Sequence, residues 1–185
     1  MEHISYRDYK FEIVLELLKN QSHIRALAKD IGTNHMTILR KIKELSDDNV
    51  IDYKQEGKNK TYFLKKSIEA RNYVMMAENY KLLQLLTKYP QLRKIVDAIH
   101  ENKHIKLAIL FGSYAKAIAK KDSDIDVYID TNGKKLKNEL ERTDSRISVK
   151  LGNYDRKSPL GKEIEKNHVI LKGMEDYYEK LGIFS

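Results

Sequence analysis

Two aspartates separated by one residue are the feature of this sequence with the clearest chemical potential. Asp124 and Asp126 alternate with Ile125 and Val127, and this period of two is typical of a β-strand. Both carboxylates therefore point to the same strand face, about 6.6 Å apart along it. Two like charges at this separation are unfavourable without a cation between them, and Mg²⁺ binds carboxylate and phosphate oxygens. The pair predicts a site for Mg²⁺ or Mn²⁺.

A glycine–serine pair lies ten residues before these aspartates. The apolar run from Ile105 to Phe111 predicts a buried strand, which ends at Gly112 and Ser113. Gly112 allows a phosphate to approach the backbone closely, because glycine has no side chain. Ser113 offers a hydroxyl and an N–H at the start of a helix, where anions are favoured. The pair predicts a phosphate-binding turn beside the metal site.

The two motifs together resemble the nucleotidyltransferase fold of the DNA polymerase beta superfamily, specifically its minimal, small-domain branch. The signature of that family is an apolar strand, Gly-Ser, about ten residues, and then Asp-apolar-Asp-apolar. Residues 111–113 and 124–127 follow it at this spacing. One departure is Ala117, which stands where the family often has glycine. The resemblance covers residues 90–185.

The resemblance also implies roles for individual residues. Gly112 and Ser113 would hold the triphosphate of an NTP substrate, with Lys116 at a position where the family often has arginine. Asp124 and Asp126 would be the catalytic carboxylates that bind Mg²⁺ or Mn²⁺. The implied reaction transfers NMP from the NTP to a hydroxyl acceptor, which is a small molecule or a protein. Small members of this branch include antibiotic-modifying enzymes and antitoxins, so the implied partners include a protein acceptor or a toxin.

The third carboxylate that the family normally supplies from the next strand has no counterpart in this sequence. That strand is expected at residues 145–151, and no acid lies in its middle. Asp144 precedes it, Asp155 follows it, and Lys150 lies within it as a candidate fixed cation. Two alternatives stay open: an active nucleotidyltransferase, and a transcription regulator whose degenerate domain only binds nucleotide or a partner protein.

The first third of the chain carries the pattern of a small helical domain. Apolar residues at helical spacing predict helices over 8–19, 24–31 and 33–45, with Thr33 as the N-cap of the third. Two short β-rich runs at 49–54 and 61–64 flank a basic turn and predict a hairpin. This order resembles the winged helix-turn-helix domain of prokaryotic transcription regulators.

Such a domain binds double-stranded DNA by placing its third helix in the major groove, while lysines of the wing contact phosphates. The alternative is a winged helix that binds protein. The candidate DNA-binding residues are Thr33, Asn34, His35, Thr37, Arg40, Lys41, Lys43, Lys54, Lys58 and Lys60.

Length and composition agree with two small domains of an α+β protein. The 185 residues include no Cys, which excludes disulfides and thiol catalysis. The net charge of +8 is spread along the whole chain and favours phosphate-bearing partners. The predicted organisation is a winged helix at 1–66, a connecting helix at 67–89 that forms a homodimer, and a nucleotidyltransferase domain at 90–185. The polar first ten residues and the lack of a long apolar run predict a cytoplasmic protein that does not interact with membranes.

Overall fold

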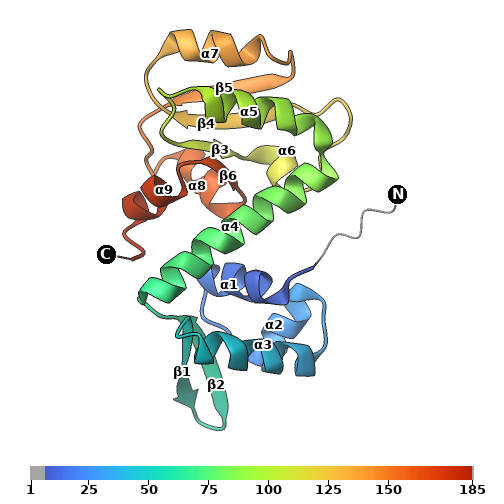
Figure 1. Ribbon diagram of the computed structural model, residues 1–185, viewed down its shortest axis with the longest axis vertical. Coiled ribbons are helices and arrows are strands. Elements are labelled where there is room, and N and C mark those ends of the chain that lie inside the picture. The colour runs from blue at the N-terminus through green and yellow to red at the C-terminus, as the bar shows by residue number, and fades with distance from the viewer. Residues whose placement is uncertain (1–6, 185) are drawn as a thin grey trace. The chain divides into compact units, whose positions relative to one another are not determined.

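A computed structural model describes residues 7–184, arranged as two compact units (Figure 1). One unit extends through Tyr80 and includes Phe184; the other comprises Lys81–Ile183. Six of the ten N-terminal residues that were used to predict a cytoplasmic protein, residues 1–6, lie outside the described residues. Within the described part of the chain, no helix combines the length and apolar character needed to cross a membrane.

The N-terminal unit contains three short helices followed by an antiparallel hairpin. Its helices have one apolar face each, and these faces bury Ile13, Leu27, Ile38 and Leu45 completely. The elements are α1 (Tyr9–Lys19), α2 (Ile24–Ile31), α3 (His35–Asp47), β1 (Ile51–Glu56) and β2 (Asn59–Leu64).

The connection between α2 and α3 is a tight turn. Gly32 ends α2 in the left-handed conformation, with φ 69°, as a C-terminal glycine commonly does. The N-cap of α3 is Asn34, whose side chain accepts a hydrogen bond from the N–H of Thr37 at 2.8 Å. The prediction that Thr33 caps this helix is therefore wrong. Asparagine is one residue closer to the first helical turn and is an equally good cap.

Asn49 joins the end of α3 to α4 (Ile68–Lys88). Its φ of 61° is in the left-handed region, which asparagine tolerates better than most residues. Its amide donates to Glu69 at 2.9 Å and accepts from Lys65, while its carbonyl accepts from the hydroxyl of Ser67 at 2.7 Å. These bonds fix the start of α4 against the hairpin.

The C-terminal unit is built on a four-stranded mixed sheet of order β5-β4-β3-β6. Strand β4 pairs in parallel with β5, and β3 is antiparallel to both of its neighbours. Besides the second half of α4, the elements are η1 (Pro90–Leu92), α5 (Arg93–Glu101), β3 (Ala108–Leu110), α6 (Gly112–Ala115), β4 (Ile125–Asp130), α7 (Lys134–Glu141), β5 (Ile147–Gly152), α8 (Pro159–Lys166), β6 (Val169–Lys172) and α9 (Met174–Leu181).

Helices cover both faces of this sheet (Figure 1). Apolar side chains of α5 and α7 form one buried cluster with the odd-numbered residues of β4 and β5. The even-numbered residues of these two strands, Asp126 and Lys150 among them, point to the opposite face, where α8 and α9 pack. The predicted α+β class, with a small mixed sheet flanked by helices, is confirmed. The winged-helix assignment and the predicted boundaries at 66 and 89 stay predictions.

Candidate functional site

The start of β4 presents the two aspartates as expected from the alternation. Asp124 is exposed and immediately precedes the strand, while Asp126 is half-buried within it. Ile125 and Val127 are fully buried on the other face. In the part of the chain that the structure describes, neither carboxylate accepts a hydrogen bond or forms an ion pair. Both aspartates therefore keep their lone pairs available for a ligand.

Gly112 is required by the carboxylate of Asp126. Its φ of 71° is in the left-handed region, and a Cβ added there would lie 2.4 Å from Oδ2 of Asp126. The adjacent N–H of Phe111 donates to the carbonyl of Asp126 at 3.0 Å, which fixes the two segments side by side. From the sequence, Gly112 is expected to let a phosphate approach the backbone closely. The structure adds a second reason, because any side chain at this position would displace the acid.

The pKa of the Asp126 carboxyl is raised. Burial is the largest cause, followed by the negative charge of Asp124. The charge of Lys150 acts in the opposite direction and lowers this pKa, and that of Glu163 raises it. Asp126 thus lies in a cluster of four charged groups from β4, β5 and α8, in which a cation would relieve the repulsion.

The β5 residue nearest the aspartates in register is polar but not acidic. Asp126 pairs with Ser148 and Tyr128 with Lys150 in the parallel ladder, so Lys150 shares the face of Asp126 one step further along. Neither of the acids that flank β5, Asp144 before it and Asp155 after it, supplies the missing third carboxylate. Asp144 is paired with the guanidinium of Arg146 at 2.6 Å, and this pair holds the pKa of Asp144 below its ordinary value.

Asp155 belongs to the turn that leads into α8. Its side chain accepts from the N–H of Lys157 at 2.8 Å, and its carbonyl accepts from the hydroxyl of Ser158. Among residues 7–184, no group of three or more His, Asp or Glu side chains is placed to hold a metal ion. The acids of the candidate site are therefore a pair, with Glu163 as a more distant third.

The predicted phosphate-binding residues lie in one short turn after β3. Ser113 is half-buried, and its carbonyl accepts from the N–H of Ile118 at 3.1 Å. Lys116 is exposed and ends α6. The next residue, Ala117, has a φ of 56°, a conformation that favours glycine. Alanine thus adopts a left-handed conformation here, at the position where the family that the sequence resembles often has glycine.

Helix α8 is anchored beside the site by a tyrosine cluster around Glu165. The hydroxyls of Tyr154 and Tyr177 both donate to Oε1 of Glu165, the latter at 2.9 Å, and Arg156 lies 3.3 Å from Oε2. Burial is the main reason why the pKa values of both tyrosines are raised. This cluster fixes the helix that carries Glu163. Neither Glu163 nor Glu165 stands out in the sequence, because no spacing distinguishes them from the other acids of the chain.

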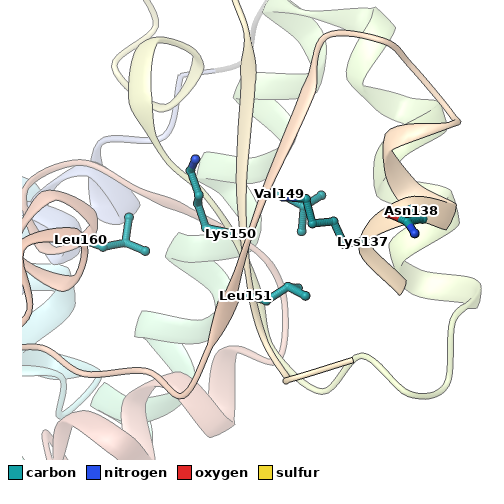
Figure 2. A pocket seen from close by; sticks show the side chains of 6 residues that line it. All are labelled: Lys137, Asn138, Val149, Lys150, Leu151 and Leu160. Carbon is teal, nitrogen blue, oxygen red and sulfur yellow. The ribbon is translucent and has the colours of Figure 1, made fainter. Parts of the chain in front are cut away.

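An open hollow of about 510 Å³ lies along β5, the edge strand of the sheet. Figure 2 shows Lys150 and Leu160 on one side of the strand, with Val149, Leu151 and Lys137 on the other. The hollow therefore extends around the sheet edge, from the face of the aspartates to the face of α7. Lys137 is paired with Glu141 at 3.6 Å.

Some of the candidate DNA-binding residues interact with other residues of the chain, and others do not within residues 7–184. Asn34 is used as a cap, and Lys41 is paired with Glu44 at 2.7 Å. Lys60 lies over the ring of Tyr53, 3.8 Å from its centroid. Lys54 lies over the Phe63 ring, and Thr33 and Thr37 are half-buried. The members that are exposed and have no ion pair, ring contact or capping bond within residues 7–184 are His35, Arg40, Lys43 and Lys58.

A family comparison assigns the segment that holds the aspartates. Residues 93–176 match the family model described as Polymerase beta, Nucleotidyltransferase. The match spans α5 to the start of α9 and contains Gly112, Ser113, Asp124 and Asp126. This part of the chain is therefore similar to a nucleotidyltransferase domain. No curated protein matches the chain.

Proposed function

We propose that the C-terminal unit transfers a nucleoside monophosphate from an NTP to a hydroxyl acceptor. One observation carries the proposal: the carboxylates of Asp124 and Asp126 share a strand face and lack protein partners within residues 7–184. That of Asp126 lies against the Gly112 turn, in the segment that matches the family model. Groups arranged only for stability would be paired, because an unpaired half-buried carboxylate is unfavourable.

The residues present fit a divalent cation. Carboxylate oxygens are the donors that Mg²⁺ and Mn²⁺ prefer, and the repulsion between Asp124 and Asp126 favours a positive charge between them. When bound, the ion would supply Lewis-acid stabilisation of the phosphoryl oxygens. The chain's own residues would do the rest: the turn at Gly112 and Ser113 orients the triphosphate, and Lys116 neutralises part of its charge.

The reaction exchanges one phosphoester bond for another. The acceptor oxygen forms a bond to the α-phosphorus, the bond from that phosphorus to the bridging oxygen breaks, and pyrophosphate leaves with the electron pair. The acceptor proton is released to a base. No acid on β5 can accept it, so water or the exposed carboxylate of Glu163 fills that role.

The second candidate is a regulator that binds nucleotide or a partner protein without turnover. The sequence of β5 favours it, because Ser148 and Lys150 share the face of Asp126 and neither supplies the carboxylate that the family normally has on this strand. Loss of a metal-binding carboxylate or of a general base reduces the reaction rate by orders of magnitude, while nucleotide binding can remain. The two candidates agree on binding and differ on chemistry.

An α-phosphate labelling experiment separates the candidates. The full chain is incubated with each of the four NTPs, labelled at the α-phosphate, with Mg²⁺ and with cell extract as the source of acceptors. The enzyme transfers label, and Asp124→Asn with Asp126→Asn abolishes the transfer. Measurable nucleotide binding without transfer from any NTP favours the regulator. Absence of both binding and transfer contradicts both candidates.

For the N-terminal unit, we propose that the helices and hairpin act as a winged helix that binds double-stranded DNA. Arg40 and Lys43 on the exposed face of α3, with Lys58 at the hairpin turn, support this proposal. Its test is selection of bound sequences from a random duplex library, followed by affinity measurements. Arg40→Ala should weaken binding about tenfold. Lys19→Ala is the control, because Lys19 is paired with Glu16 on α1; equal affinities of the wild type and Arg40→Ala contradict the groove assignment.

For the connecting helix, we propose that α4 forms the homodimer interface. Ile68, Met76 and Leu83 are large apolar side chains that stay 78%, 47% and 63% exposed in the single chain. The polar residues Asn72 and Asn79 on the same face donate to their own helix backbone, which lowers the penalty of burying them. Light scattering at several concentrations tests the dimer. Leu83→Glu should give monomers, and an unchanged mass contradicts the proposal.

A further inference from the structure

Lys150 is the charged residue of β5 that faces the two aspartates. It pairs in register with Tyr128, one step along from the pair of Asp126 and Ser148. Because side chains of a strand alternate between faces, its ammonium group is on the side of Asp126, and Figure 2 shows it directed away from Val149 and Leu151. Lys150 is exposed, and within residues 7–184 no carboxylate forms an ion pair with it.

The surrounding acids do not compensate this charge locally. Asp144 is occupied by Arg146, and Asp155 is turned into its own loop. The exposed Glu163 of α8 has no hydrogen-bonding partner in the described part of the chain. On its own face of the sheet, Lys150 therefore acts on the aspartates at the start of β4, which have no protein partner within residues 7–184, and on any phosphate bound between them.

We propose that Lys150 supplies, as a fixed ammonium group, the positive charge that a second divalent ion provides in a site with three carboxylates, so that Asp124 and Asp126 bind a single divalent cation. The inference rests on the proposed nucleotide site and says how that site is charged. Two carboxylates and one ammonium carry a net charge of −1, which one divalent ion reverses. Three carboxylates carry −3 and need two ions.

An ammonium group and a divalent ion differ in two ways that can be measured. Lysine is attached to the strand, so its contribution to triphosphate binding persists without metal and weakens with salt. It cannot accept ligands, so the second metal position does not exist until the ammonium group is removed. Both properties are tested by binding experiments, without any assay of turnover.

The first experiment counts Mn²⁺ ions. The full chain is titrated with Mn²⁺ alone, and free Mn²⁺ is followed by electron paramagnetic resonance. The wild type should bind one ion per chain, and Lys150→Asp should bind two. Lys137→Asp is the matched control, because Lys137 borders the same hollow on the opposite side of β5. It should bind one ion, which shows that an added acid near the hollow is not sufficient.

The second experiment uses tripolyphosphate, the part that all NTPs share. In metal-free buffer its affinity should fall about tenfold in Lys150→Met and less than about twofold in Lys137→Met, because only the first removes a charge facing the aspartates. Circular dichroism confirms that each variant is folded. Lys150→Met keeps the length of the side chain, so it serves where Lys150→Asp fails to fold.

The outcomes separate this inference from the proposed function. Two Mn²⁺ ions in the wild type, or one ion in folded Lys150→Asp, overturn the role of Lys150 and leave the nucleotide site standing. Two ions in the wild type that become one in Glu163→Gln identify Glu163 as the third ligand instead. No Mn²⁺ and no tripolyphosphate bound to the wild type overturn the proposed function and the inference together.

Discussion

The two ends of β4 carry acids on the same face of the sheet, but the acids at one end have protein partners and those at the other end have none within residues 7–184. At the end of the strand, Asp130 is paired with Lys180 at 2.9 Å and accepts from the N–H of Tyr154. Nearby, Glu165 accepts from two tyrosine hydroxyls. At the start, Asp124 and Asp126 have no such partners within residues 7–184. One end is a satisfied network and the other is a pair of unsatisfied carboxylates.

This difference indicates which acids stabilise the fold and which are held ready for a ligand. A carboxylate with charged or hydroxyl partners recovers the hydration that it loses on burial, whereas an unpaired one does not. The raised pKa of Asp126 is the sign of that unrecovered penalty. Substitutions of the partnered acids at the end of β4 should therefore reduce stability. Substitutions of Asp124 or Asp126 at its start should reduce ligand binding.

The largest effect is expected from Gly112→Ala. The added methyl group would meet Oδ2 of Asp126 at 2.4 Å, so the carboxylate must move out of position. Displacing one of two metal ligands should weaken Mn²⁺ binding by about a hundredfold. Gly32→Ala is the control, since its φ of 69° imposes the same backbone strain of about 1 kcal/mol with nothing within 4 Å of the new atom. Equal Mn²⁺ affinities for the two variants would show that Gly112 does not position the acid.

A smaller but substantial effect on stability is expected from Glu165→Ala. The change leaves the hydroxyls of buried Tyr177 and half-buried Tyr154 without their acceptor, which should lower the free energy of unfolding by about 2 kcal/mol. Glu163→Ala, two residues earlier on α8, should change it by less than about 0.5 kcal/mol because that side chain is exposed and has no partner in the described part of the chain. Urea unfolding of both variants measures the difference. Similar losses in the two would remove the distinction between satisfied and unsatisfied acids.

Two buried tyrosines allow the same comparison for hydroxyl groups. The hydroxyl of Tyr114 is fully buried with no hydrogen-bond partner among residues 7–184, whereas that of Tyr177 donates to Glu165. Tyr114→Phe should therefore raise the free energy of unfolding by up to about 1 kcal/mol, and Tyr177→Phe should lower it by about the same amount. Thermal unfolding followed by circular dichroism measures both. A loss of stability in Tyr114→Phe would mean that its hydroxyl has an interaction that the structure does not include.

The sequence was sufficient for features that depend on local periodicity. Alternating residues placed Asp124 and Asp126 on one face, and helical spacing located α1, α2 and α4 within one or two residues. The cap of α3 was misplaced by one residue, because Thr33 and Asn34 are both good caps and only the backbone path decides between them.

Features that depend on contacts between distant segments could not be predicted. The approach of Gly112 to Asp126 depends on the pairing of β3 with β4, and the contribution of Glu163 depends on where α8 packs. The position of Lys150 was predicted as a strand residue, but its effect on Asp126 required the parallel register of β4 and β5. No pattern within a single segment encodes these distances.

The smallest effect concerns Asp144, the acid that precedes β5 and is paired with Arg146. Its pKa is lowered from 3.8 in the folded chain, chiefly by the hydrogen bonds from the Arg146 side chain. The folded state therefore binds fewer protons than the unfolded state near this pKa. The pair stabilises the fold above pH 3.8 and loses its effect as the pH falls through the lower pKa of the folded state. Asp144→Ala should lower the free energy of unfolding at pH 7 by no more than about 1 kcal/mol, because the pair is near the surface.

Urea unfolding between pH 7 and pH 3 tests this prediction. The gap between the wild type and Asp144→Ala should be constant down to about pH 5 and should shrink below 3.8. Mn²⁺ affinity should be unchanged, since Asp144 already has its cation in Arg146 and its charge is not among those that shift the pKa of Asp126. A gap that is independent of pH, with Mn²⁺ binding lost, would place Asp144 with the unsatisfied acids as a metal ligand. In that case the start of β4 would have its third carboxylate, and the charge of Lys150 would have to serve a different purpose.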